Sequence, residues 1–159
     1  MMNVTVIAVG KLKESYLRDG CREYIKRLGA YAKINIIEIS EERCEDNPSS
    51  AEIDNVISRE GERICAKIPK GAVVIPLCIE GREYASPEFA RLIEQQAMQT
   101  SSLCFIIGGS YGLSDSVKML GKNKLSFGKM TLPHQLARMV LLEQIYRGFS
   151  ILNNSKYHK

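Results

Sequence analysis

The sequence predicts a single α/β domain over residues 1–159, in which a mostly parallel sheet is flanked by helices. Short runs rich in Val, Ile and Leu alternate along the chain with longer segments whose apolar residues recur every three or four positions. The short runs lack a polar face, as parallel strands covered by helices do. A chain of 159 residues is also long enough to bury its own core.

The first third of the chain predicts strand, helix and strand in that order. Residues 3–9 (NVTVIAV) are largely β-branched and predict a buried strand that ends at Gly10. Residues 14–31 place Leu, Cys, Tyr and Ile at helical spacing and predict an amphipathic helix. Residues 33–39 (KINIIEI) alternate between polar and apolar, which predicts a second strand.

The middle of the chain predicts a mobile loop, a helix and a central strand. Residues 40–50 (SEERCEDNPSS) are acidic and rich in turn residues, so we expect a surface loop. Residues 51–68 fit one apolar helical face, although Gly61 weakens its middle. Residues 72–79 (AVVIPLCI) predict a strand in which Pro76 cannot donate to a ladder. We therefore expect this strand to end or bulge where a ligand approaches its backbone.

The remaining elements before the last helix follow the same alternation. A helix is predicted to begin with Ser86 as N-cap and Pro87 at the first helical position. Residues 102–107 (SLCFII) predict a buried strand that runs into a glycine-rich turn and a short helix ending near Leu120. Residues 124–130 (KLSFGKM) predict one more short strand.

The last predicted helix, residues 134–150, has almost no polar side and must be covered on more than one flank. One sheet face covers a single flank, so the other requires a second layer of the same chain or a partner subunit. We expect a homodimer. The apolar positions are Leu136, Ala137, Met139, Val140, Leu141, Leu142, Ile145, Tyr146 and Phe149.

The composition argues against a metal site and a disulfide framework. Five cysteines are spaced at intervals of about twenty residues without a CxxC pair, and the chain has only two histidines, His134 and His158. Reduced core cysteines are the better interpretation. The opening run NVTVIAVG has neither a basic leader nor the length of a signal-peptide core, and no run is long enough to span a membrane. We expect a cytoplasmic protein without membrane association.

The basic side chains gather in the last third of the chain. Residues 118–159 carry eight Lys and Arg against one acid, Glu143, although the whole chain has a net charge of only +4. Such an asymmetry is typical of a protein with a polyanionic partner, and a solvated surface explains the charge about as well. In so apolar a helix, Arg138 and Arg147 are expected either to pair with Glu143 or to face an anion.

Two segments are candidates for a binding site on pattern alone. Residues 106–114 (IIGGSYGLS) place two glycines at the carboxyl end of a buried strand, where open α/β sheets bind ligands. The spacing matches neither a P-loop nor a dinucleotide fingerprint, and a plain turn explains it equally well. Residues 128–138 (GKMTLPHQLAR) lead into a helix whose first N–H groups are unpaired, and His134 there is more simply a residue of the first helical turn.

Three stretches, taken together, resemble the ribosomal RNA large subunit methyltransferase H family. They are VVIPLCIEGREYAS, FIIGGSYGLS and LPHQLARMVLLEQIYRGFSILNNSKYHK, and the likeness also includes the opening AVGKLKESYL. Members of that family are small SPOUT methyltransferases that use S-adenosyl-L-methionine. The resemblance implies an α/β fold with a trefoil knot, a homodimer, and methylation of N3 of a pseudouridine in 23S rRNA of assembled ribosomes. Nothing in the periodicity itself indicates a knot.

The resemblance also assigns residues to the methyl donor. An adenine needs apolar walls and backbone partners, which this set offers, and Gly109 is expected to leave room for the ribose and methionine portions. The residues implied are Leu77, Gly109, Gly128, Lys129, Met130, Thr131, Leu132 and Pro133.

For the RNA, the resemblance implies that Arg147, Tyr157 and His158 form the catalytic end, with Lys156 and Lys159 beside them. The imide N–H of pseudouridine must lose its proton on methylation, and a neutral imidazole can accept it. We expect His158 to be that base; positioning of the nucleobase by His158, with proton loss to water, is the alternative. Tyr157 is expected to stack on the base and Arg147 to hold phosphate.

Two other functions fit part of the same pattern. A SPOUT methyltransferase that acts on another RNA, such as tRNA, would keep the donor residues and change its surfaces. A ribosome-binding protein without catalysis would keep the basic third but would not need the glycine turn together with the TLPH loop.

Overall fold

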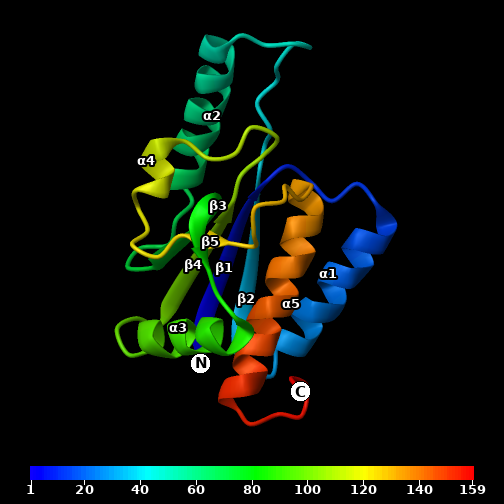
Figure 1. Cartoon of the computed structure of the whole chain (residues 1–159), viewed down its shortest axis with the longest axis vertical. Coiled ribbons are helices and arrows are strands. Elements are labelled where there is room, and N and C mark those ends of the chain that lie inside the picture. The colour runs from blue at the N-terminus through cyan, green and yellow to red at the C-terminus, as the bar shows by residue number, and fades with distance from the viewer.

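A computed structural model describes all residues, 1–159, and confirms the predicted α/β class. Five parallel strands form one sheet in the order β2-β1-β4-β3-β5 (Figure 1). The strands are β1 (Met2–Val9), β2 (Ala32–Ile39), β3 (Val73–Glu83), β4 (Ser102–Ile107) and β5 (Leu125–Ser126). The helices are α1 (Ser15–Leu28), α2 (Ser50–Cys65), α3 (Ser86–Ala97), α4 (Asp115–Lys118) and α5 (His134–Leu152).

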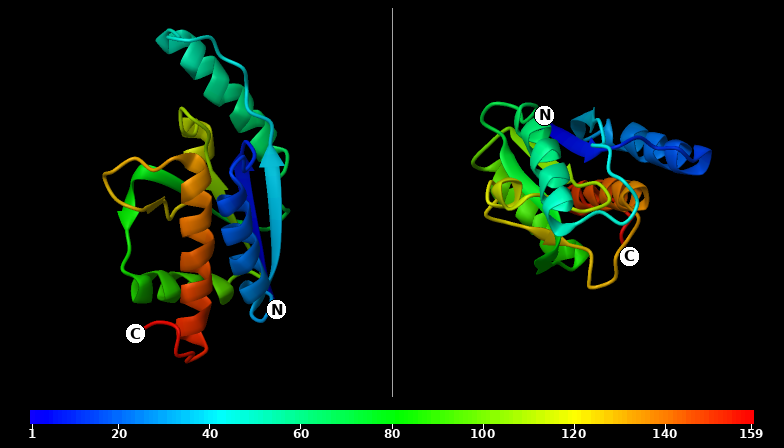
Figure 2. Two further views of the ribbon diagram at one scale, coloured as in Figure 1. Left: turned by 90° about the vertical axis from the view of Figure 1, so that its right-hand side faces the viewer. Right: turned by 90° about the horizontal axis from the view of Figure 1, so that it is seen from above.

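Helices cover both faces of the sheet, and alternate residues of each strand point to opposite layers. On one side, Val4, Val6 and Ala8 of β1 pack in a core with α1, α3 and α5. On the other side, Ile7 and Val9 join a smaller core with α2 and α4. Helix α2 continues beyond the end of the sheet together with the acidic loop that precedes it (Figure 2).

Helix α5 lies along the sheet with α1 on one side and α3 on the other, so the chain itself covers most of its apolar surface. Arg138 is the only buried charged residue of helix α5, and it is 3% exposed. The guanidinium of Arg138 donates to Glu38 at 2.8 Å and to the carbonyl of Gly10 at 3.1 Å. A partner subunit is not needed to explain these contacts, and the homodimer stays a prediction.

Strand β3 has the irregularity that Pro76 predicts, and the approach of a ligand there stays a prediction. It pairs with β4 only from Val73 to Pro76 and with β5 at Leu77 and then at Arg82, with a shift in register between the two. The strand therefore runs on to Glu83 but is irregular at its centre. At Gly81, a Cβ atom would lie 2.8 Å from the carbonyl oxygen of Lys124, so only glycine allows β5 to cross so closely.

Three local predictions were wrong. The strand expected at 124–130 is limited to Leu125–Ser126, because the chain turns at Gly128, whose φ is +128°. The N-cap of α3 is Ala85, whose N–H donates to Glu88 at 2.9 Å, while Ser86 is already helical. Of the five cysteines, only Cys21 and Cys104 are buried, and Cys44 and Cys65 are exposed.

Helix α2 is continuous through Gly61, where a weak point was expected. A Cβ atom at Gly61 would lie 2.7 Å from Ser114 Oγ, so the glycine allows α2 to pack against the start of α4. No helix of the structure is both long and apolar enough to cross a membrane. No group of three or more His, Cys, Asp or Glu side chains is placed to bind a metal ion.

Candidate functional site

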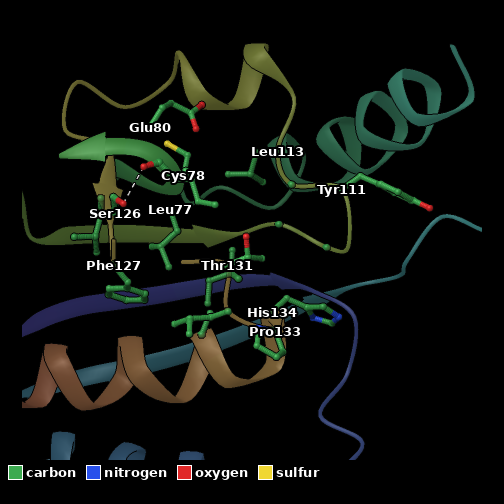
Figure 3. A pocket seen from close by; sticks show the side chains of 18 of the residues that line it. Leu77, Cys78, Glu80, Tyr111, Leu113, Ser126, Phe127, Thr131, Pro133 and His134 are labelled. Carbon is green, nitrogen blue, oxygen red and sulfur yellow. Dashed lines mark hydrogen bonds between the residues drawn. The ribbon is translucent and has the colours of Figure 1, made fainter. Parts of the chain in front are cut away.

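A cavity of about 720 Å³ opens at the carboxyl ends of β3 and β4 (Figure 3). Its walls come from the irregular part of β3, the glycine turn after β4, and the loop between β5 and α5. This volume lies in the range of pockets that hold ligands of cofactor size. We call it the main cavity.

The glycine turn is closed by its own backbone. The N–H of Gly112 donates to the carbonyl of Gly109 at 3.1 Å, and a Cβ atom at Gly108 would lie only 2.7 Å from the backbone of Gly112. At Gly109, a Cβ atom would lie 3.0 Å from Val9 Cγ1 and 3.4 Å from Glu60 Oε1. A side chain at Gly109 would therefore crowd the core beneath the turn, and Gly109 is also part of the cavity wall; its role in leaving room for the ligand stays a prediction.

The loop after β5 is fixed by one buried hydroxyl. Ser126 Oγ donates to the carbonyl of Ile79 at 2.9 Å and accepts from the N–H of Gly128 at 3.1 Å (Figure 3). These two bonds connect the irregular part of β3 to the turn at Gly128. The segment from Phe127 to Pro133 consequently folds over the cavity in place of extending the strand.

The main cavity brings together seven of the eight residues predicted to bind the methyl donor. Lys129 is the exception: it is exposed and is not part of the wall. The seven are Leu77, Gly109, Gly128, Met130, Thr131, Leu132 and Pro133.

Sequence reasoning missed several wall residues, among them Tyr111, Phe127 and His134. His134 does begin α5, as the simpler interpretation held, and it also lines the cavity. The only feature of the sequence that could have placed His134 in the cavity wall is its position directly after the TLP segment.

The residues predicted for the RNA form a second cluster at the other end of α5. Both Nε and Nη2 of Arg147 donate to Glu143 Oε1, at 2.9 and 2.6 Å, and Nη1 lies 3.1 Å from His158 Nδ1. The hydroxyl of Tyr157 donates to the same oxygen of Glu143 at 3.1 Å. We call Glu143, Arg147, Tyr157 and His158 the tail cluster.

The tail cluster is organised around its single carboxylate. Burial and the hydrogen bond to Glu143 raise the pKa of Tyr157 to about 12, so its phenol stays protonated near neutral pH. The hydrogen bond to Glu143 also raises the pKa of Arg147. The ring of Tyr157 packs edge-on against Tyr146, with centroids 4.7 Å apart. The guanidinium of Arg147 lies 4.8 Å from the centroid of the Tyr157 ring. Tyr157 therefore anchors the last residues to α5.

Comparisons with known proteins show the family of this chain. A family model described as predicted SPOUT methyltransferase matches residues 2–158. The ribosomal RNA large subunit methyltransferases H of Carboxydothermus hydrogenoformans and Latilactobacillus sakei are 50% and 52% identical over 159 residues, which is 99% of this chain and 100% of each relative.

The chain belongs to the ribosomal RNA large subunit methyltransferase H family. Solved structures with low identity show the same fold. A probable rRNA-methyltransferase from Porphyromonas gingivalis matches with a TM-score of 0.54 at 16% identity, covering 95% of this chain and 70% of that one. A probable methylase family protein from Haemophilus influenzae matches with a TM-score of 0.53 at 13% identity, covering 99% and 70%.

In this member of the methyltransferase H family, the main cavity and the tail cluster lie far apart within one protomer. The cavity is next to His134, at the first residue of α5, and the tail follows Leu152, at its last. The tail folds back so that His158 is bound to Arg147, which is 13 residues and about 20 Å along α5 from His134. Figure 2 shows the loop before α5 and the C-terminus at opposite ends of that helix. The structure thus does not bring His158 to the cavity of its own chain.

The packing beneath the glycine turn can be tested at Glu60, whose carboxylate lies under Gly109. It is 3% exposed, its Oε2 accepts from the N–H of Glu42 at 2.9 Å, and its Oε1 has no partner. Burial raises its pKa above the ordinary value. A raised folded-state pKa gives stability that is present below the unfolded-state value, about 4.3 for Glu, and is lost as the pH rises through the folded-state value.

We therefore expect Glu60→Gln to be more stable than the wild type at pH 7, with a difference that shrinks as the pH falls toward 4. Urea unfolding of both proteins from pH 4 to 8, at one protein concentration, measures it. Glu62→Gln, at an exposed position of the same helix, is the control and should show no such trend. A difference between wild type and Glu60→Gln that is constant over this range would contradict the assignment.

Proposed function

We propose that this protein transfers a methyl group from S-adenosyl-L-methionine to N3 of a pseudouridine in 23S rRNA of assembled ribosomes, working as a homodimer in the cytoplasm. The observation that carries the proposal is the main cavity, whose wall contains nearly all of the residues predicted for the methyl donor. Full-length relatives that are about 50% identical and are named for large-subunit rRNA methylation support the substrate class.

The cavity suits such a donor. Leu77, Met130 and Leu132 supply apolar surface for an adenine, and the glycine turn gives close access to backbone. Bound there, S-adenosyl-L-methionine supplies an electrophilic methyl group on a positively charged sulfur. The chain's part is to hold this group, to keep water away from it, and to present the nucleobase to it in line.

The distance between the cavity and the tail cluster supports a dimer with shared sites. One protomer provides the cavity, yet its own His158 is bound to Arg147, about 20 Å along α5 from the cavity wall at His134. In a two-fold symmetric dimer with α5 helices in opposite directions, the tail of one subunit would reach the cavity of the other. We also propose that the chain has the trefoil knot that the resemblance implies.

The hydrogen bond between Arg147 and His158 bears on how the proton leaves. A guanidinium only donates, so Nδ1 of His158 accepts, and a neutral imidazole then carries its proton on Nε2. In this state Nε2–H is a donor, suited to a carbonyl oxygen of the nucleobase. The geometry thus favours positioning of the base by His158, with proton loss to water, over the base role that we first expected.

The first experiment tests the substrate. Purified protein and labelled S-adenosyl-L-methionine are incubated with assembled ribosomes, with free large subunits and with tRNA, and the products are mapped by mass spectrometry. We expect one methyl group on N3 of a pseudouridine of 23S rRNA, with assembled ribosomes the best substrate. Methylated tRNA would support the alternative substrate. Binding to ribosomes without calorimetric binding of the donor and without methylated RNA would support a ribosome-binding protein without catalysis.

The second experiment tests His158 by two substitutions. Gln can place an N–H donor near the position of Nε2 but cannot accept a proton as imidazole does. We expect His158→Ala to reduce the single-turnover rate by roughly 10²-fold, a typical loss when one positioning hydrogen-bond donor is removed, and His158→Gln to recover part of it. The pH–rate profiles of His158→Gln and wild type should have the same shape from pH 6 to 9. A His158→Gln rate as low as that of His158→Ala, with a changed profile, would restore the base role.

A further inference from the structure

The loop between β1 and α1 carries a basic surface that the proposed reaction does not use. It consists of Gly10, Lys11, Leu12 and Lys13, and we call it the basic loop. It leaves the carboxyl end of β1, which is the same edge of the sheet on which the main cavity opens.

The backbone of the basic loop is fixed by side chains from both neighbouring helices. Buried Arg138 donates to the carbonyl of Gly10 at 3.1 Å. Arg18 Nη1 donates to the carbonyls of Leu12 and Lys13, at 3.1 and 2.7 Å. The N–H of Lys13 donates to Gln135 Oε1 at 2.8 Å. A loop held at this many points has little conformational freedom left to lose on binding.

The two ammonium groups of this fixed loop are free. Lys11 and Lys13 are exposed, and neither forms an ion pair. Arg18 and Arg22 continue the positive charge along α1 at a spacing of one helical turn. With Arg138 they line a cavity of about 370 Å³ between α1, β2 and α5.

Most of the acidic side chains around this surface already lie next to a basic side chain. Glu38 in that cavity is paired with Arg138 at 2.8 Å, and Asp19 lies 3.5 Å from Arg22 on the exposed side of α1. Glu14 is exposed at the end of the loop. Glu41 lies on the side of the main cavity, 4.0 Å from His134 Nε2, and so limits where an anion can approach.

The basic loop also borders the main cavity. A Cβ atom at Gly10 would lie 3.3 Å from Cε1 of His134, which is part of the cavity wall. The φ of Gly10 is +90°, a conformation that other residues rarely adopt, so the turn that brings the loop to this wall depends on glycine. A nucleotide that enters the cavity would therefore have its flanking backbone near this loop.

We propose that the basic loop, with Arg18 and Arg22, binds phosphates of the RNA strand next to the nucleotide that enters the main cavity of the same protomer. This inference rests on the proposed function, because it assumes an RNA substrate. Lysines bind phosphate as point charges, so the contacts would hold the strand without reading its sequence. The loop would serve substrate binding and not the chemical step.

The test compares the double variant Lys11→Ala/Lys13→Ala with Lys67→Ala/Lys70→Ala, which removes the same charge from exposed positions near the end of α2. Binding of each protein to purified ribosomes is measured at several salt concentrations, with donor binding measured by calorimetry. We expect the loop variant to bind ribosomes about 10-fold more weakly and to reduce the slope of log affinity against log salt by about 1 to 2, one lost phosphate contact per lysine. Donor binding should be unchanged, and the control should match the wild type.

Equal affinity and equal salt slope in the loop variant and the control would overturn the inference. Weaker binding to ribosomes but unchanged binding to protein-free 23S rRNA would also overturn it, because the partner of the loop would then be an acidic ribosomal protein. These outcomes are distinct from failure of the proposed function, in which the wild type itself binds the donor but neither binds nor methylates ribosomes.

Discussion

The length of one helix sets the arrangement on which this account depends. Helix α5 begins at the wall of the main cavity and ends at the tail cluster, and its packing against α1, α3 and the sheet keeps it straight. The main cavity and the tail cluster are thus held apart along α5 within one protomer. Our proposal that the cavity of one subunit works with the tail of another follows from this separation and requires a dimer.

Ion pairs organise both the first turns of α5 and its second half, and only the pair near the cavity joins residues far apart in the sequence. Near the cavity, Arg138 joins Glu38, a hundred positions away in the chain, to the first residue of the basic loop. At the other end, Glu143 is the only acid of the basic third, and it orients Arg147 and Tyr157 together. Removing either acid would leave a cation without its partner, which would both release the groups that the pair holds and, at buried Arg138, lower stability.

Much of the fold followed from hydrophobic spacing, and the failures have physical causes. The β1 and β4 strands and the α5 helix were predicted to within about two residues, because each is a nearly continuous apolar run whose ends are marked by glycine, proline or polar residues. The strand at 124–130 was wrong, because its alternation does not reveal that Ser126 and Gly128 turn the chain. The site could not be predicted from pattern alone. Its residues came from a family resemblance, and Glu60 and His134 gained their places only from tertiary packing.

The most direct measurement of the central claim is complementation between two inactive subunits. Leu77→Trp, which fills the main cavity, and a chain lacking residues 155–159 are given different affinity tags, and their heterodimer is purified through both. Each homodimer should be inactive on ribosomes. The heterodimer should recover about half of the wild-type rate, because one of its two sites combines an intact cavity with an intact tail. An inactive heterodimer that still binds the donor, or an active homodimer of the truncated chain, would contradict the shared site.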